Sequence, residues 1–86
     1  MSDPTGLFNR IRPRLHAIAY RMLADVAEAE DVVQEAWLRW HAADTSCLDN
    51  PAAWLVTVAT RLSIDRLRAA KAQRDLARKQ QGSANR

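Results

Sequence analysis

Apolar residues recur at intervals of three and four along most of this chain, and this spacing limits its fold more than any other feature. Such a spacing places side chains on one face of an α-helix, whereas a strand would place them at every second position. Only two glycines and three prolines occur among the 86 residues, which leaves little turn material for a fold of many short strands. The sequence therefore predicts an all-α protein.

Three periodic segments predict a three-helix bundle. The expected helices cover residues about 5–23, 26–41 and 51–79, with a polar loop at about 42–49. Pro13 falls inside the first helix, so we expect that helix to be kinked or weak in its first half. Residues 81–86 lose the periodicity, and we expect this tail to fray.

Two polar residues mark the starts of the second and third helices. Asp25 is followed three residues later by Glu28, which is an acidic variant of the capping box. Asn50 precedes Pro51, and Asn is a favoured N-cap while Pro is favoured at the first helical position. Both starts therefore have a local physical reason.

The apolar stripes of the three helices form the predicted core. In the first helix they are Leu7, Phe8, Ile11, Leu15, Ile18, Ala19, Met22 and Leu23. In the second they are Ala29, Val33, Ala36, Trp37 and Trp40, and in the third Trp54 or Leu55, Val58, Leu62 and Ala69. Helical spacing alone leaves Trp54 open to two interpretations, a core residue or a stacking platform beside the polar loop.

Charge is divided unevenly along the chain. Residues 1–50 carry five basic and eight acidic side chains, whereas residues 51–86 carry eight basic and two acidic ones. A basic helix indicates nucleic acid as a partner, but an acidic helix repels a phosphate backbone and needs a different one. The plainer alternative is that both are ordinary solvated faces, with Asp65 in a helix-surface ion pair to Arg61 or Arg68.

The chain has few side chains of the kinds used in catalysis, and their spacing matches no known arrangement of catalytic or metal-binding residues. Neither His16 nor His41 has a carboxylate or a cysteine at metal-ligand or triad spacing. Glu30 and Asp31 are adjacent on a helix and point in different directions, and the two glycines form no phosphate loop. We therefore expect no enzyme, no metal and no cofactor.

The same survey bears on the cellular compartment. Cys47 is the single cysteine, so an intramolecular disulfide framework is excluded. The longest run without a charged side chain is residues 50–60, well short of the roughly 20 residues that span a bilayer. No apolar signal core follows the N-terminus. We expect a cytoplasmic protein that does not enter a membrane.

Three blocks of sequence, at residues 14–23, 29–40 and 50–68, resemble region 2 of the extracytoplasmic-function (ECF) sigma factors. These proteins are promoter-specificity subunits of bacterial RNA polymerase in the sigma-70 family. The resemblance covers residues 7–74 and implies a single domain at 1–80. Nothing in the chain resembles region 4, which reads the −35 element.

The resemblance implies one partner for each charged surface. The second helix would dock on the β′ clamp helices of the polymerase core through Asp31, Gln34 and Glu35, with Leu38 adding apolar area. The third helix would bind and melt the −10 element and hold its non-template strand. The candidate DNA-binding residues are Asn50, Trp54, Arg61, Arg66, Arg68, Lys71 and Arg74.

The polar loop has its own implied role. In ECF members a flipped base of the non-template strand sits in a pocket made largely by this loop, here about residues 41–50. The candidate lining residues are Asp44, Thr45, Ser46, Cys47 and Asp49. Ala53 stands before Trp54 where housekeeping members have a second tryptophan, which implies weaker melting and stricter promoter choice. The resemblance also allows an anti-sigma protein or regulatory domain as a partner.

Two other functions compete with this interpretation. One is a helix-turn-helix or homeodomain-like regulator with the third helix in the major groove of duplex DNA. Its usual turn has three or four residues, whereas this loop has about eight, and it leaves the acidic surface without a use. The other is a protein-interaction bundle whose basic helix is merely solvated, which a salt titration of DNA binding would distinguish.

Overall fold

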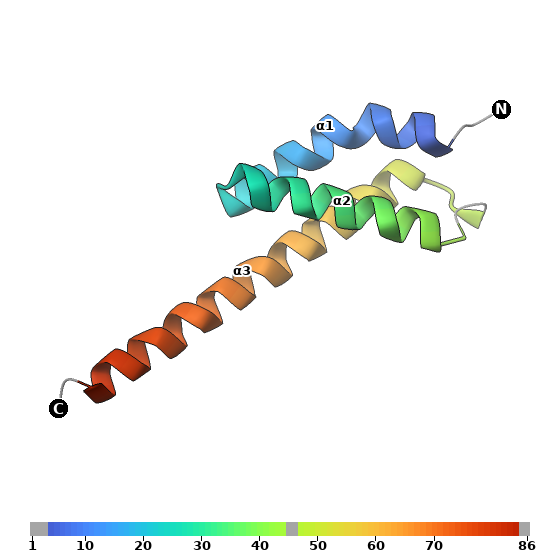
Figure 1. Cartoon of the computed structure of the whole chain (residues 1–86). Coiled ribbons are helices and arrows are strands. Elements are labelled where there is room, and N and C mark those ends of the chain that lie inside the picture. The colour runs from blue at the N-terminus through green and yellow to red at the C-terminus, as the bar shows by residue number, and fades with distance from the viewer. Residues whose placement is uncertain (1–3, 45–46, 85–86) are drawn as a thin grey trace.

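The computed structural model describes residues 4–44 and 47–84, and these fold into three α-helices. They are α1 (Pro4–Leu23), α2 (Val26–Ala42) and α3 (Pro51–Ala84). α1 and α2 form an antiparallel hairpin, and α3 packs across both (Figure 1). The predicted all-α three-helix bundle is therefore confirmed.

The helix boundaries differ most from expectation at the end of α3. The helix continues to Ala84, past the predicted end at 79 and through most of the tail that was expected to fray. This part of the chain is rich in Ala, Arg, Lys and Gln, which favour helix without any need for a buried face. α1 runs through Pro13 as one helix, although Pro13 cannot donate a backbone hydrogen bond.

The link between α1 and α2 is short and tightly defined. Ala24 has a φ of 53°, and its N–H donates to the Tyr20 carbonyl at 2.7 Å, which closes the end of α1. The Asp25 carboxylate then accepts a hydrogen bond from the Glu28 N–H at 3.0 Å. Asp25 is thus the N-cap of α2, as the sequence predicted.

The core lies where the three helices meet. Phe8 and Leu15 from α1, Val32 from α2 and Leu55 from α3 are fully buried. Helix α3 enters this core with Leu55, Ala59 and Ser63, each one turn after the last. The Ser63 hydroxyl donates to the Ala59 carbonyl at 2.8 Å, so its buried oxygen is satisfied. Ala59 and Ser63 are small, so α3 presents little side-chain bulk to the hairpin where these two residues are buried.

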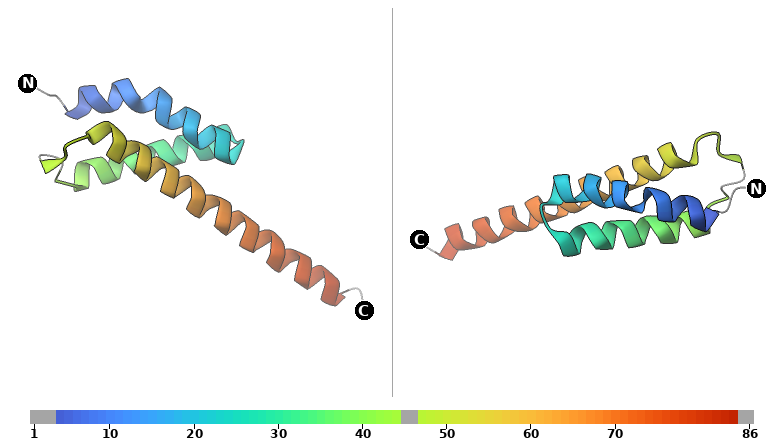
Figure 2. Two further views of the ribbon diagram at one scale, coloured as in Figure 1. Left: turned by 180° about the vertical axis from the view of Figure 1, so that it is seen from behind. Right: turned by 90° about the horizontal axis from the view of Figure 1, so that it is seen from above.

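The second half of α3, residues 67–84, projects away from the bundle, and we call it the arm (Figure 2). Residues 67–79 are all exposed, including Ala69, so the prediction that Ala69 is buried is wrong. The molecule measures 66 × 22 × 16 Å, and its radius of gyration is 16.8 Å. A compact chain of this length would have a radius of gyration of about 12 Å.

Within residues 4–44 and 47–84, no helix is both long enough and apolar enough to cross a bilayer.

Candidate binding surfaces

One face of α2 carries the predicted docking residues, and it points away from the core. We call Asp31, Gln34, Glu35 and Leu38 the α2 stripe. Asp31, Gln34 and Leu38 are exposed, and the Glu35 side chain is 44% exposed. The opposite face of the helix is buried through residues such as Val32 and Ala36. The stripe is therefore accessible along its whole length.

The stripe combines charge with apolar area. Glu35 lies 3.7 Å from Arg39, one turn further along, in an exposed ion pair of the kind that contributes little. Leu38 is 56% exposed at the end of the stripe. A partner with basic side chains could therefore displace Arg39 at small cost and cover Leu38 at the same time.

A groove between α1 and α2 adjoins the stripe, and helical spacing alone did not predict it. Its volume is about 730 Å³, and Arg12, His16, Glu30, Gln34 and Trp37 are among its lining residues. Trp37 packs its ring edge-on against Phe8 at 4.8 Å and against His41 at 4.0 Å. The prediction that Trp37 packs on the core is confirmed, but its ring also reaches this groove. The pairing of α1 with α2 brings Arg12 and Glu30 into the lining of one groove, which a pattern within a single helix cannot predict.

The basic side chains of α3 are mostly accessible. Arg61, Arg68, Lys71 and Arg74 are exposed, and the last three lie on the arm. In the described part of the chain, Asp65 forms no ion pair with Arg61 or Arg68. These cations are therefore not neutralised by the acidic neighbour on their own helix.

Arg66 is the exception among the predicted DNA-binding residues. Its Nη1 donates to Glu28 Oε2 at 2.9 Å and lies 3.9 Å from Asp31 Oδ2. The side chain therefore reaches from α3 to the acidic helix, although its charge and its place on α3 predict a DNA contact. A pattern that compares residues within one helix cannot reveal this pairing, because the two residues are 38 positions apart.

Asn50 and Trp54 lie at the start of α3, where the polar loop ends. The Asn50 Oδ1 accepts a hydrogen bond from the Ala53 N–H at 3.1 Å, so Asn50 is the predicted N-cap. Trp54 is half-buried, and its ring centre lies 5.8 Å from that of the buried Trp40. Trp54 therefore packs against the core and remains partly exposed.

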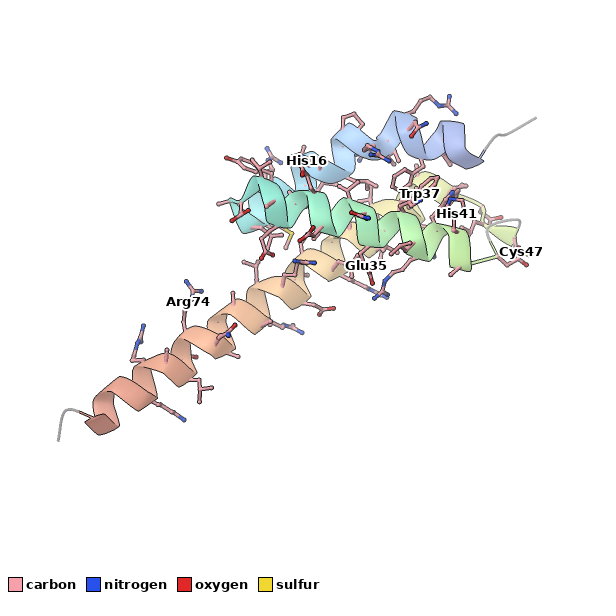
Figure 3. All side chains as sticks on the ribbon, viewed as in Figure 1. His16, Glu35, Trp37, His41, Cys47 and Arg74 are labelled. Carbon is pink, nitrogen blue, oxygen red and sulfur yellow. The ribbon has the colours of Figure 1, made fainter. Side chains whose placement is uncertain are left out.

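The loop itself is described only in part. Asp44, Cys47 and Asp49 are exposed, and Leu48 packs against the core. Thr45 and Ser46, two of the residues predicted to line a base pocket, lie outside the described residues. Cys47 and His41 lie near the same end of the bundle, whereas Arg74 lies on the arm, far from that end (Figure 3).

Comparison with known proteins identifies relatives of one kind. Residues 7–73 match the family model described as Sigma-70 region 2. The chain is 52% identical over 68 residues to the ECF RNA polymerase sigma factor SigJ of Mycobacterium tuberculosis, which covers 79% of this chain and 22% of SigJ. It is 40% identical over 62 residues to the ECF RNA polymerase sigma factor SigW of Bacillus subtilis, which covers 70% of this chain and 33% of SigW.

A third relative fits the same pattern. The probable ECF RNA polymerase sigma factor SigI of Mycobacterium tuberculosis is 38% identical over 64 residues, covering 74% of this chain and 22% of SigI. The chain thus spans between about a fifth and a third of the length of these curated relatives. No solved structure matches it significantly.

Proposed function

The chain belongs to the sigma-70 region 2 family, and we propose that it docks on the β′ clamp helices of RNA polymerase and binds and melts the −10 promoter element. It would serve as the promoter-recognition domain of an alternative sigma factor of the ECF class. The observation that carries this proposal is the separation of charge: an exposed acidic stripe on α2 and an exposed basic surface on α3.

The α2 stripe is the proposed polymerase contact. Asp31 and Glu35 would pair with basic side chains of the clamp helices, Gln34 would hydrogen-bond between them, and Leu38 would add buried apolar area. Charge pairs of this kind set the register and the rate of association more than the final affinity. The exposure of all four side chains supports this role.

The beginning of α3 and its arm are the proposed DNA contact. Arg61, Arg68, Lys71 and Arg74 would contact phosphates, which supply affinity without reading sequence. Trp54 would stack at the edge between paired and unpaired DNA, and its incomplete burial supports this. Asn50 would contribute through its amide nitrogen, because its side-chain oxygen already caps α3.

The polar loop before α3 would receive a flipped base of the non-template strand. Extruding a base costs a few kcal/mol, which contacts within a pocket must offset. The exposed residues at 47 and 49 lie between the end of α2 and the start of α3, next to Asn50. This position beside Trp54 supports a joint role for the loop and the tryptophan.

A charge reversal on the stripe tests the polymerase contact. Glu35→Arg should weaken binding to core polymerase about 10- to 100-fold, because like charges would then face each other across the interface. Asp75→Arg on the arm is the matched control, since it changes net charge equally at a site remote from the stripe, and it should bind core like the wild type. The measurement is a fluorescence titration of labelled chain with core enzyme. Equal loss in both variants would contradict the proposed stripe.

The DNA contact is tested by comparing the affinity for a forked DNA with the affinity for a fully paired duplex. In complex with core polymerase, the chain should bind a fork with an unpaired non-template strand more tightly than the corresponding duplex. Trp54→Ala should reduce binding to the fork by about 1–3 kcal/mol, the value of one base–aromatic stack. Equal affinity for fork and duplex, unaffected by Trp54→Ala, would instead support a reader of intact duplex DNA.

A further inference from the structure

Arg66 joins the two charged helices of the bundle. Its guanidinium donates to Glu28 on α2 at 2.9 Å and lies 3.9 Å from Asp31, a member of the α2 stripe. The Arg66 side chain is 36% exposed, less than either carboxylate that it faces. We call this interaction of Arg66 with Glu28 the clasp.

The clasp lies where α3 leaves the bundle. Leu55, Ala59 and Ser63 are the buried residues of α3, and Arg66 follows Ser63 by three positions, on the same side of the helix. Beyond it, residues 67–79 are all exposed. A notch of about 560 Å³ opens there between the arm and the turn of the α1–α2 hairpin, with Glu28, Arg66 and Arg74 among its lining residues.

A small change in the direction of α3 at the clasp would produce a large displacement at the far end of the arm. The 18 residues from 67 to 84 make a helix about 27 Å long at about 1.5 Å per residue. A change of about 10° in the direction of α3 at Arg66 would therefore move the tip of the arm by about 5 Å. Such a shift is large compared with the reach of a hydrogen bond to a phosphate.

The same side chain serves poorly as a phosphate contact. Its guanidinium is held by a carboxylate and lies next to a second one, so a phosphate brought to Arg66 would also meet the charges of Glu28 and Asp31. Arg68 and Lys71, by contrast, are exposed and have no ion-pair partner in the described part of the chain. Arg66 is thus set apart from the cations that follow it on the arm.

We propose that Arg66 is a positioning residue that fixes the direction of the arm relative to the α2 stripe through Glu28. This inference rests on the proposed function, because it concerns how one bundle engages the polymerase and DNA together. Two sites on one rigid body strengthen each other only if their geometry allows simultaneous engagement. The clasp would maintain that geometry and would add little to stability itself, since the pair is partly exposed.

A charge swap distinguishes the clasp from a phosphate contact. The measurement is binding of a fluorescent DNA fork with a random-sequence single-stranded arm, with and without saturating core polymerase. Glu28→Arg and Arg66→Glu should each lower fork affinity in the core-bound complex about tenfold, by loss of joint engagement. The double variant Glu28→Arg/Arg66→Glu should recover most of that loss. If the double variant stays as weak as Arg66→Glu, Arg66 is a DNA contact and the clasp proposal is wrong.

The wild type provides the control for the underlying function. If core polymerase gives no gain in fork affinity to the wild-type chain, the proposed function fails, and the clasp is then decided by a distance measurement. Spin labels at Val26→Cys and Leu76→Cys, in a Cys47→Ser background, report the separation of α2 from the arm by pulsed EPR. The clasp predicts a narrow distribution that broadens in Arg66→Gln and in Glu28→Gln. An unchanged distribution in both variants would overturn it.

Discussion

Asn50 shows how one side chain can serve both the fold and the proposed function. Its Oδ1 caps α3 by accepting from the Ala53 N–H, while its carbonyl accepts from the Trp54 N–H at 3.1 Å. The residue is exposed, so its amide nitrogen remains available for a contact beside the polar loop. The cap therefore holds Trp54 and the proposed DNA contact in one rigid turn.

Two substitutions at Asn50 separate these contributions. Asn50→Ala should lower the free energy of unfolding by about 1 kcal/mol, because the cap is lost. Asn50→Asp should keep the cap and the stability, since Asp is an equally good N-cap and its charge suits the helix N-terminus. The added negative charge should nevertheless weaken fork binding. Urea unfolding and fork titration measure the two effects, and a destabilised Asp variant would contradict the capping role.

At the same scale, the sequence predicted the two helix caps because each cap depends on neighbours within one helix. Asp25 and Asn50 cap their helices as expected, and Gln34 and Glu35 remain accessible. Arg66 could not be placed in this way. Its partner Glu28 is on another helix, and charge alone does not distinguish the role of Arg66 from that of Arg68.

At the scale of elements, the crossing of α3 over the hairpin depends on small side chains. Ala59 and Ser63 are fully buried where α3 packs on the other helices. The periodicity of the third helix predicted a buried face, and Leu55 is on it, but Ala69 is not because α3 has already left the bundle. The apolar periodicity of the third helix continues to Ala69, beyond the last residue that packs on α1 or α2. Periodicity within one helix cannot show where its contacts with other helices end.

Substitution of Ser63 tests how tightly α3 packs. Ser63→Leu should lower the free energy of unfolding by about 1–3 kcal/mol, because extra methylene groups cannot fit at a close helix crossing. Ser63→Ala is the matched control and should change stability by less than about 1 kcal/mol, since it removes a hydroxyl that bonds only within its own helix. Unfolding in urea measures both. If Leu were tolerated as well as Ala, the close approach of α3 would be contradicted.

The elongation of α3 was predicted only in part. The helix continues to Ala84, which the helix propensity of its residues favours, although residues 67–79 are all exposed. The expected fraying rested on the loss of apolar periodicity, which reports burial and not helicity. In the arm, helix propensity therefore determines the secondary structure, whereas the loss of apolar periodicity indicates only that the helix is not buried.

At the scale of the whole molecule, a small core supports two separate surfaces. The hairpin of α1 and α2 presents the acidic stripe, and α3 extends the basic surface beyond the bundle to give a length of 66 Å (Figure 1). The division of charge between residues 1–50 and 51–86 anticipated these surfaces. Their relative direction could not be anticipated, because it depends on how α3 crosses the hairpin.

The central claim is that the polymerase and the unwound strand bind different faces of one bundle. Backbone amide NMR of the isotope-labelled chain tests it most directly, with a peptide coiled coil of the β′ clamp helices and a single-stranded oligonucleotide as the two ligands. The clamp fragment should shift amides around the α2 stripe, and the oligonucleotide should shift those from Asn50 through the arm, with each set unchanged when the other ligand is already bound. Shifts of one common set by both ligands, or displacement of one ligand by the other, would contradict the account.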